Sequence, residues 1–580
     1  MCGIAGIFYK ERKPFSKSTI KSEIGQLLDP MKYRGPDNMG FYHNHRGALG
    51  HLRLSIIDLS DSANQPMSSP HDKRITIIYN GEIYNYLEIK QQLLNKYQFI
   101  TNSDTEVILN SYLEWGTDCV KMFNGMWSFA IYDERTDLLF CSRDRMGIKP
   151  FYYSITGDRL IFASEIKAFH NLNSFDKKIN QNAVMDNMIY GPKPFGETQI
   201  KGVFELEAGS NLIFKKDKVH FEKYFKLENT FDYSLKNFSL NEIESLINDS
   251  VKLRLRSDVP VATLNSGGLD SSLISAITSK ENKKLLTFSV SPELKNGILQ
   301  PGDESNYSEI IAKFLGTEHF VHRYSEKDFQ SIVKNIKYLN DGELYHSNTI
   351  PLYMLYREIK KKGITVVLSG EGADEIFRGY SSNFRYTLAN FTPKWLFFKI
   401  FKHKIKNKEY FTEPFSNYRK GISMMNSLFL NKEMIEKYFN KQYELPEERK
   451  ELFYIMDQMK PSSAITYFEQ KCYLAGLLRR LDRTSMANSI ESRVPFLDHR
   501  IVEYMNKIPH HKKVGYTRDS VKKILKKVAI NYLPKEIVYR RKYGFATPVG
   551  KYIQQNNSLN KYDLSNEEKW YFSSIQFDNH

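Results

Sequence analysis

The stretch Val261-Ala262-Thr263-Leu264-Asn265-Ser266-Gly267-Gly268-Leu269-Asp270-Ser271-Ser272 decides the fold of the second half of the chain. Its apolar, β-branched start predicts a buried strand, and residues 271–279 predict a helix. The two glycines between them let the backbone approach a phosphate, and a helix N-terminus presents unpaired N–H groups to an anion. The segment therefore predicts a strand–loop–helix anion site.

The alternation of strands and helices continues through the second half. Residues 285–290 and 364–368 are apolar and predict two more strands. The second of these leads into Ser369-Gly370-Glu371-Gly372-Ala373-Asp374-Glu375, whose carboxylates are the oxygen ligands that Mg²⁺ prefers between phosphate groups. Beyond residue 390 the pattern is mostly helical. Such alternation is typical of a parallel sheet covered by helices, which we expect from residue 240 onward.

The first part of the chain has a different pattern. Short β-branched or aromatic runs bounded by Gly, Asn or Asp predict many strands, and few segments have a helical period. The strands are expected at residues 4–8, 74–79, 126–132, 138–142 and 160–163, and the helices at 18–28, 86–96 and 105–115. Residues 226–241 are polar and aperiodic, which predicts a linker. An antiparallel α+β domain therefore precedes the parallel one.

Composition limits the class of protein. A chain of 580 residues, 41% of them apolar, is too long for one core and predicts two or three domains. No apolar run approaches the ~20 residues of a membrane span, and the N-terminus lacks a signal-peptide layout. The four cysteines, Cys2, Cys119, Cys141 and Cys472, have neither disulfide nor metal spacing. This usage suits a reducing cytosol, so we expect a cytoplasmic protein without a membrane partner.

The net charge is +16, with lysine-rich runs at residues 399–408 and 518–527. Such runs are typical of solvated helix faces, so we interpret them as surface and expect no nucleic-acid partner. A basic surface also favours anionic small molecules such as ATP and aspartate.

The second residue is a cysteine followed by glycine. Removal of the initiator methionine would place a thiol and a free α-amino group on Cys2. The thiolate is the nucleophile, and an N-terminal amine titrates near ~8, close enough to neutrality to act as its base. Position alone is a weak indication, because most cysteines at this position have no such role.

Four polar clusters accompany Cys2 in the first part of the chain. They are Tyr33-Arg34-Gly35-Pro36-Asp37, Gly50-His51-Leu52-Arg53-Leu54-Ser55-Ile56-Ile57, Tyr79-Asn80-Gly81-Glu82-Ile83-Tyr84-Asn85 and Ser103-Asp104-Thr105-Glu106. Each alone reads as a turn or a helix cap. Together they resemble the glutaminase domain of class II glutamine amidotransferases. The resemblance implies an αββα sandwich of the N-terminal-nucleophile hydrolase type over residues 1–224.

In that family the cysteine thiolate attacks the carboxamide of glutamine, giving a thioester and ammonia. The resemblance assigns the oxyanion hole to the Asn80 amide and the Gly81 N–H. It also places the α-carboxylate of glutamine at a planar arginine fork and its α-ammonium at carboxylates. The glutamine-binding residues it implies are Arg53, Leu54, Ser55, Ile56, Ile57, Asn80, Gly81, Glu82 and Asp104.

The glycine loop at 266–272 lacks the Gly-Lys-Ser/Thr of a Walker motif and instead resembles the pyrophosphate loop of ATP pyrophosphatases. Residues 479–487, 492–498 and 541–545 extend the likeness. The order of both halves resembles glutamine-hydrolysing asparagine synthetases over residues 1–550. The implied fold is a doubly wound ATP-pyrophosphatase domain with a helical C-terminal part, at residues 240–580.

The resemblance implies that the aspartate β-carboxylate attacks the α-phosphate of Mg-ATP, and that internally transferred ammonia displaces AMP from β-aspartyl-AMP. It makes Glu371 and Lys542 catalytic, the first accepting a proton and the second neutralising the leaving diphosphate. It implies Asp270 and Asp374 for Mg²⁺. The expected nucleotide-binding residues are Asn265, Ser266, Gly267, Gly268, Asp270, Ser271, Val290, Ser369 and Gly370.

Two residues depart from the family pattern. Asn265 stands where an apolar residue is usual, and Arg378 stands where glycine is common. The chain also ends soon after Phe545. Two alternatives therefore stay open: another carboxylate acceptor, such as a sugar uronate or a peptide, and a catalytically silent scaffold or nucleic-acid binder on the same fold. The expected partners are glutamine, aspartate and ATP, with a homodimer as the expected assembly.

Overall fold

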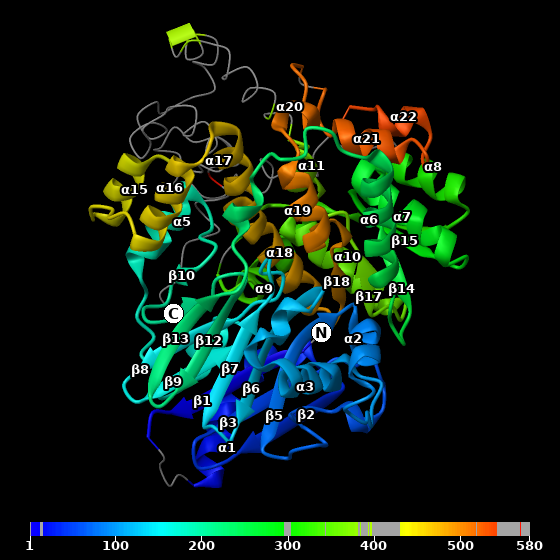
Figure 1. Ribbon diagram of the computed structural model, residues 1–580. Helices are drawn as coiled ribbons and strands as arrows, with labels where there is room; N and C mark the ends of the chain where they lie inside the picture. The colour runs from blue at the N-terminus through cyan, green and yellow to red at the C-terminus, as the bar shows by residue number, and fades with distance from the viewer. Residues whose placement is uncertain are drawn as a thin grey trace.

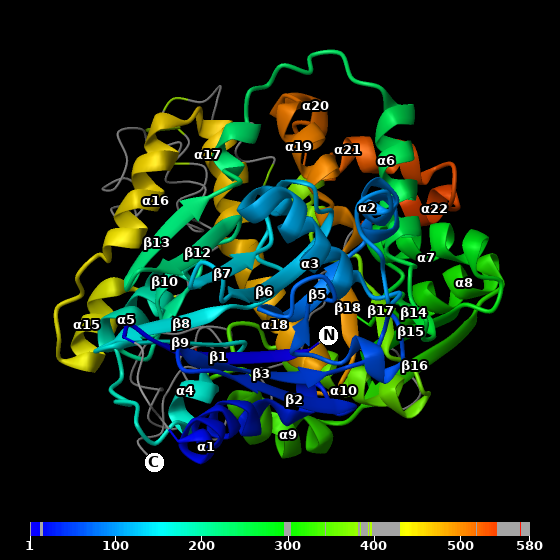
Figure 2. The same ribbon diagram turned by 60° about the horizontal axis from the view of Figure 1, so that its bottom comes forward.

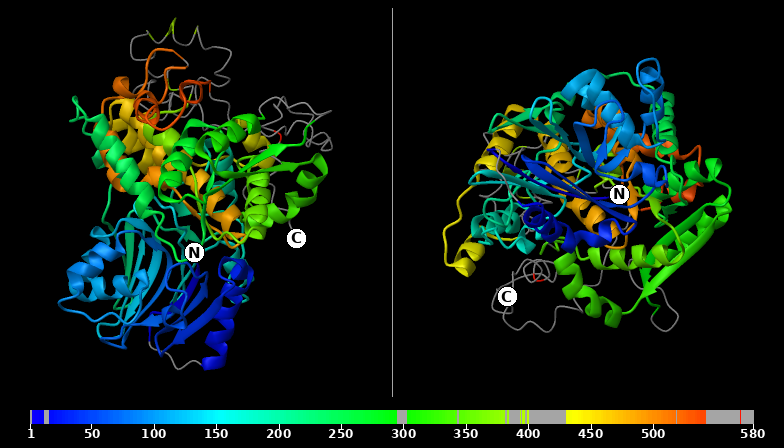
Figure 3. Two further views of the ribbon diagram at one scale, coloured as in Figure 1. Left: turned by 90° about the vertical axis from the view of Figure 1, so that its right-hand side faces the viewer. Right: turned by 90° about the horizontal axis from the view of Figure 1, so that it is seen from below.

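The computed structural model describes residues 2–11, 16–294, 303–342, 344–380, 430–517 and 519–541, with a few isolated positions between 383 and 399 and residue 569. Antiparallel sheets from the first part of the chain form one end of the molecule, and a parallel sheet with many helices forms the other (Figure 1). The first strand starts at the boundary between the two (Figure 3).

The first domain contains two antiparallel sheets. The seven-stranded sheet has the order β10-β11-β8-β9-β1-β3-β2 and the six-stranded sheet the order β13-β12-β7-β6-β5-β4. Their strands are β1 Gly3–Tyr9, β2 Asn38–His43, β3 Gly47–Arg53, β4 Met67–Ser68, β5 Ile75–Ile83, β6 Gly125–Asp133, β7 Leu138–Arg143, β8 Tyr152–Thr156, β9 Arg159–Ala163, β10 Gly196–Glu197, β11 Phe204–Glu205, β12 Ser210–Lys215 and β13 Lys218–Lys223.

The alternation of side chains along β1 explains why the sheets stack. Ile4 and Phe8 face the six-stranded sheet, in a core they share with strands from both sheets. Ala5 and Ile7 face the opposite way and pack with α1 (Lys17–Leu28) and α4 (Lys167–Asn171). On the far side, α2 (Tyr86–Leu93) and α3 (Asp104–Trp115) cover the six-stranded sheet. This is the αββα sandwich that the family resemblance implies.

The second domain is built on a five-stranded parallel sheet of order β16-β15-β14-β17-β18. Helices lie on both sides of it, so the sheet is doubly wound (Figure 2). All three residues of β17 are fully buried, as expected of a strand covered on both faces. The strands are β14 Val261–Leu264, β15 Leu286–Pro292, β16 Glu318–Tyr324, β17 Val366–Leu368 and β18 Glu491–Arg493.

Helices make up the remainder of this domain, including the predicted helical C-terminal part. They are α6 Leu240–Leu253, α7 Leu269–Glu281, α8 Ser305–Leu315, α9 Glu326–Leu339, α10 Thr349–Lys361, α11 Ala373–Phe377, α15 Lys432–Phe439, α16 Glu447–Gln458, α17 Pro461–Phe468, α18 Leu474–Met486, α19 His499–Lys507, α20 His510–Lys513, α21 Lys523–Ala529 and α22 Lys535–Val538. A π-turn, η8 (Glu469–Tyr473), joins α17 to α18.

The polar segment between the domains differs from the expected linker. A 3₁₀ turn, η4 (Leu227–Thr230), forms there, and Leu227 is buried in a hydrophobic cluster to which both domains contribute. Spaced apolar residues in an otherwise polar segment are enough to anchor it. Within the described part of the chain, no helix is long and apolar enough to cross a membrane.

Candidate active sites

Cys2 is held at both ends of its backbone, immediately before β1. Its N–H donates to Asn80 Oδ1 at 3.0 Å, and its carbonyl accepts from Arg34 Nε at 3.1 Å. Only 7% of the residue is exposed. Burial raises the pKa of the Cys2 thiol, while the Leu54 N–H and the Arg53 guanidinium act in the opposite direction. The thiol is therefore fixed in place and needs a base to become a nucleophile.

Asn80 offers a free donor beside this thiol. Its side chain is fully buried, and Nδ2 has no hydrogen-bond partner among the described residues. Gly81 follows it on β5 with φ +155°, and a Cβ built there would lie 2.1 Å from the Met126 carbonyl oxygen of β6. Only glycine fits this close approach. An unused buried donor next to a nucleophile is what an oxyanion hole requires.

Arg53 ends β3 and is nearly buried. Its guanidinium donates to the Ser60 carbonyl and to Asn64 Oδ1, both at 2.8 Å, and to the Asp58 carbonyl. Among the described residues no carboxylate forms an ion pair with it. The arginine is thus rigidly held by neutral acceptors while its charge stays available for a substrate carboxylate.

Two carboxylates complete this site from β5 and α3. Asp104 Oδ2 accepts from the Ile83 N–H at 2.9 Å and from the Tyr79 hydroxyl at 3.0 Å. Glu82 is buried as well, and burial, with Glu491 next, raises its pKa well above the usual range. Arg493 of β18 approaches Glu82 at 3.7 Å without a hydrogen bond, so Glu82 Oε2 can still accept one from a ligand ammonium group.

The segment 54–57 follows β3 and lines the domain boundary. Leu54, Ile56 and Ile57 are buried in one hydrophobic cluster with residues of the second domain. The Ser55 N–H donates to Asp37 Oδ2 at 2.7 Å, and the Ile56 carbonyl accepts from the Asp258 N–H at 2.9 Å. These residues therefore join the glutamine site to the other half of the molecule.

Glutamine binding should depend on pH through Asp104. Burial raises its pKa to about 6, although the Ile83 N–H and the Tyr79 hydroxyl lower it. Only the ionised carboxylate attracts an ammonium group, so the KM for glutamine in the glutaminase reaction should rise as pH falls through about 6. A pH series of initial rates measures this. An Asp104→Asn variant should bind weakly at every pH, and a wild-type KM that stays flat between pH 5 and 7 would contradict the assignment.

Hydrogen bonds between serine side chains within the glycine loop, which lies between β14 and α7, fix its conformation. Ser271 Oγ contacts the Ser266 N–H at 3.1 Å and the Ser266 hydroxyl at 3.0 Å. Gly267 has φ +73°, and a Cβ there would lie 2.6 Å from the Ser308 nitrogen of α8. Gly268 faces open space apart from Ser266 Oγ. The loop is tight on one side and open on the side where an anion would bind.

Asn265 does not face this open side. Its side chain is fully buried, donates to the Ser308 carbonyl at 3.1 Å and accepts from the Gly267 N–H at 3.2 Å. Asn265, although polar where the family usually has an apolar residue, therefore stabilises the loop from its buried side. Val290, on β15, is partly buried against the core.

The second loop lies directly against the first. A Cβ on Gly370 would lie 2.8 Å from the Ser271 nitrogen and 3.0 Å from Asp270. Ser369 is nearly buried and its hydroxyl accepts from the Glu371 N–H at 3.2 Å. The two predicted anion loops therefore form one site at the carboxyl ends of neighbouring parallel strands.

Lys522 joins the two carboxylates expected to bind a metal. Its ammonium lies 2.5 Å from Asp270 Oδ2 and 2.6 Å from Asp374 Oδ1. The side chain is 4% exposed, so the interpretation of residues 518–527 as a solvated helix face is wrong at this position. A cation held between Asp270 and Asp374 shows that both carboxylates point to one place.

Glu371 and the end of the described chain complete the second site. Glu371 Oε2 lies 2.8 Å from Arg480 Nη2 of α18. Arg540 donates to the Gly267 carbonyl at 3.2 Å and pairs with Glu304 at 2.5 Å. Lys542 lies outside the described residues. The sequence interpretation missed Lys522, Arg480 and Arg540, although the last two stand within or beside the quoted motifs.

Arg378, the second departure, has its own partners. It is fully buried with φ +63°, a conformation that explains why glycine is common there. Its guanidinium pairs with Glu469 of η8 and donates to Asn383 Oδ1 at 3.0 Å. The arginine is thus neutralised within the protein and places no free charge in the site.

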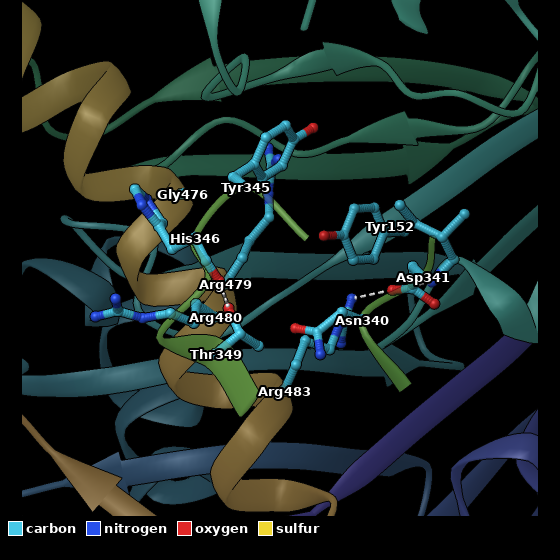
Figure 4. A pocket seen from close by; sticks show the side chains of 11 residues that line it. Tyr152, Asn340, Asp341, Tyr345, His346, Thr349, Gly476, Arg479, Arg480 and Arg483 are labelled. Carbon is cyan, nitrogen blue, oxygen red and sulfur yellow. Dashed lines mark hydrogen bonds and ion pairs between the residues drawn. The ribbon is translucent and has the colours of Figure 1, made fainter. Parts of the chain in front are cut away.

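A small cavity lies at the boundary between the domains and is lined by Arg480, the ion-pair partner of Glu371 (Figure 4). Its walls come from α18, from the segment between α9 and α10, and from Tyr152 and Ile166 of the first domain. Arg480 lines it and donates to Asn348 Oδ1 at 2.6 Å. Burial lowers the pKa of His346 in its wall to about 3, so that imidazole is neutral.

Each half of the chain matches a known protein family. Residues 1–225 match the glutamine amidotransferase domain, and residues 242–566 match the asparagine synthase model. The chain belongs to the asparagine synthase family. Asparagine synthetase [glutamine-hydrolyzing] 3 of Bacillus subtilis is 33% identical over 93% of this chain and 86% of its own length. Asparagine synthetase [glutamine-hydrolyzing] 1 of the same organism is 31% identical over 97% and 89%.

One further relative carries a different name. Amidase chry2 of Gibberella zeae is 27% identical over 96% of this chain and 91% of its own length. Family membership confirms the predicted resemblance and the two-domain fold, and it identifies the chain as a member of a family of ATP-dependent ligases. The roles of individual residues stay predictions.

Proposed function

We propose that this enzyme makes L-asparagine, L-glutamate, AMP and diphosphate from L-aspartate, L-glutamine, ATP and water. The observation that carries the proposal is that Lys522 draws Asp270 and Asp374 together where the two anion loops meet, while Cys2 faces the unused Asn80 amide in the same chain. We place the glutaminase domain at residues 1–224 and the synthetase domain at residues 240–580, in a cytoplasmic enzyme.

In the glutaminase half, Cys2 attacks the glutamine carboxamide carbon and forms a thioester. Once Met1 is removed, the nitrogen that now bonds to Asn80 Oδ1 is an amine, which takes the thiol proton and returns it to the leaving ammonia. The Asn80 amide and the Gly81 N–H stabilise the oxyanion. Arg53 holds the α-carboxylate, and Asp104 with Glu82 holds the α-ammonium. Water then hydrolyses the thioester to glutamate.

In the synthetase half, the two loops hold the ATP phosphates while the acceptor carboxylate attacks the α-phosphorus and diphosphate leaves. Asp270 and Asp374 are hard oxygen donors that fit Mg²⁺. When bound there, Mg²⁺ neutralises phosphate charge. Lys522 and Lys542 are the cations we assign to the leaving diphosphate. Glu371, oriented by Arg480, accepts a proton as ammonia displaces AMP from the acyl adenylate.

Ammonia must pass between the sites without becoming ammonium, which has no nucleophilic lone pair. Leu54, beside Cys2, belongs to one continuous hydrophobic cluster with Met126 and Ile148 of the first domain and Leu481 of α18. Arg480, the partner of Glu371, precedes Leu481 on that helix. We propose that ammonia passes along this apolar boundary, because apolar side chains would exclude the water that protonates it.

The alternative acceptors are a sugar uronate or a peptide carboxylate. One relative that matches nearly the whole chain is named an amidase, and this name supports an acceptor other than aspartate. The two Bacillus subtilis relatives named asparagine synthetase are more similar to this chain than that amidase is, at 33% and 31% identity against 27%, which favours aspartate. The silent-scaffold alternative predicts decayed sites, whereas the described catalytic groups are all present.

Diphosphate release with a panel of carboxylates tests the proposal. With Mg-ATP and glutamine, aspartate should support at least ~10-fold higher kcat/KM than glutamate, β-alanine, a uronate or a short peptide, a ratio of about 1.4 kcal/mol. Product mass identifies asparagine. Faster turnover with another carboxylate would replace aspartate as the substrate, and release with none of them would overturn the synthetase assignment.

A further inference from the structure

Arg493 ends β18 in the second domain and reaches toward the glutamine site of the first. The residue is fully buried. Its Nε donates to Glu491 Oε1 at 2.5 Å, and Nη1 donates to the carbonyls of Arg254 and Arg256 at 2.7 Å each. Its Nη2 lies 3.7 Å from Glu82 Oε2. The side chain is therefore anchored in one domain and faces a glutamine-site carboxylate in the other.

The backbone of the same residue supports the nucleotide site. β17 and β18 pair in parallel with Leu368 opposite Arg493. The Arg493 carbonyl accepts from the Ser369 N–H at 2.8 Å, at the start of the loop that carries Glu371. One residue thus contacts the glutamine site through its side chain and the nucleotide loop through its main chain.

The contact between Arg493 and Glu82 is incomplete. At 3.7 Å the two groups attract each other, but neither Arg493 Nη2 nor Glu82 Oε2 has a hydrogen-bond partner among the described residues. Both atoms are buried, so each is costly to leave unsatisfied. Glu82 also faces the carboxylates of Glu491 and Asp104. A ligand ammonium would complete the hydrogen bonding of Glu82 and change its interaction with Arg493.

We propose that Arg493 is a positioning residue that couples the two active sites, because its guanidinium shares Glu82 with the α-ammonium of glutamine while its carbonyl holds Ser369. The inference rests on the proposed role of Glu82. Binding of glutamine alters the charge facing Arg493 and thereby the segment that starts the nucleotide loop. Coupling of this kind is reciprocal: glutamine and Mg-ATP must change each other's dissociation constant by the same factor.

A full-length Cys2→Ala protein, which binds glutamine without consuming it, provides the test. We measure the dissociation constant of Mg-ATP by calorimetry with and without saturating glutamine, and that of glutamine with and without Mg-ATP. Each should change by the same factor of at least ~5, the lower end of common allosteric couplings. Adding Arg493→Met should bring both ratios to within twofold of one. Adding Arg256→Met, which removes the ion pair with Glu88 across the same boundary, should leave the coupling intact.

If Arg493→Met fails to fold, Glu82→Gln in the Cys2→Ala protein tests the same coupling and leaves Arg493 unchanged. It should weaken glutamine binding and abolish the coupling at saturating glutamine. Coupling absent from the Cys2→Ala parent, or unchanged by Arg493→Met or Glu82→Gln, would overturn the inference. If Glu82→Gln leaves the glutamine dissociation constant unchanged, the glutamine-site assignment fails instead, and this inference fails with it.

Discussion

Replacing Cys2 by alanine is expected to lower glutamine-dependent asparagine formation by at least ~10³-fold, because loss of a nucleophile removes the covalent route. Ammonia-dependent formation should stay within about threefold. The backbone contacts that fix this position, to Asn80 and Arg34, do not involve the thiol and survive the change. Alanine also keeps the buried backbone in place. Diphosphate release with glutamine or with ammonium chloride as nitrogen donor measures both activities.

Cys119→Ala is the matched control. Cys119 is also buried and lies in η3 (Gly116–Lys121), away from the domain boundary. Its substitution should leave the ratio of the two activities unchanged. Loss of both activities in Cys2→Ala, with unchanged thermal unfolding, would show that the two chemistries do not occupy separate sites.

The residues of the glutamine site were assigned through a family resemblance, and the motifs that carry this resemblance are local. Asn80 and Gly81 stand together on one strand, and Asp104 is the first residue of a helix that Ser103 caps, so each motif carries its residues within a short segment. The contact between Arg34 and Asp482 shows what local signals omit. Their side chains meet at 2.8 Å although 448 positions separate them. No period or turn signal encodes such a pairing.

Lys522 could not be assigned for a different reason. Read as one helix, residues 518–527 present lysines on a solvated face. In the structure α21 begins at Lys523, and Lys522 precedes it with φ +53°. That left-handed turn directs the side chain inward to two carboxylates. A one-residue difference in a helix boundary therefore separates a surface lysine from a buried one.

A glycine-containing strand was missed by the fold prediction. β3 has the sequence GALGHLR and was not predicted, because glycine is rare in strands. Gly50 lies on the face toward α1, where a Cβ would come 2.4 Å from Ile24 Cγ2. Packing of the helix on the sheet requires glycine here and overrides the local preference.

Glu371→Gln is expected to lower asparagine formation with either nitrogen donor by ~10²–10³-fold, the usual contribution of a general base. Glutamine keeps the size of the side chain and a hydrogen bond to Arg480, but it cannot accept a proton from ammonia. Glutaminase activity should stay within about threefold, because Glu371 belongs to the second domain. Glutamate release and diphosphate release, measured on the same samples, separate the two effects.

Glu375→Gln offers a control four residues away on the same loop and helix. Burial, with the charge of Asp374 next, raises the pKa of Glu375 to about 8, and its carboxyl bonds to the Tyr380 hydroxyl. The group is therefore largely neutral at pH 7, and glutamine resembles its neutral form, so the rate should fall by less than ~5-fold. A loss in Glu375→Gln as large as in Glu371→Gln would assign the effect to the loop as a whole, and a parallel fall in glutaminase activity would exclude Glu371 as a base specific to the synthetase reaction.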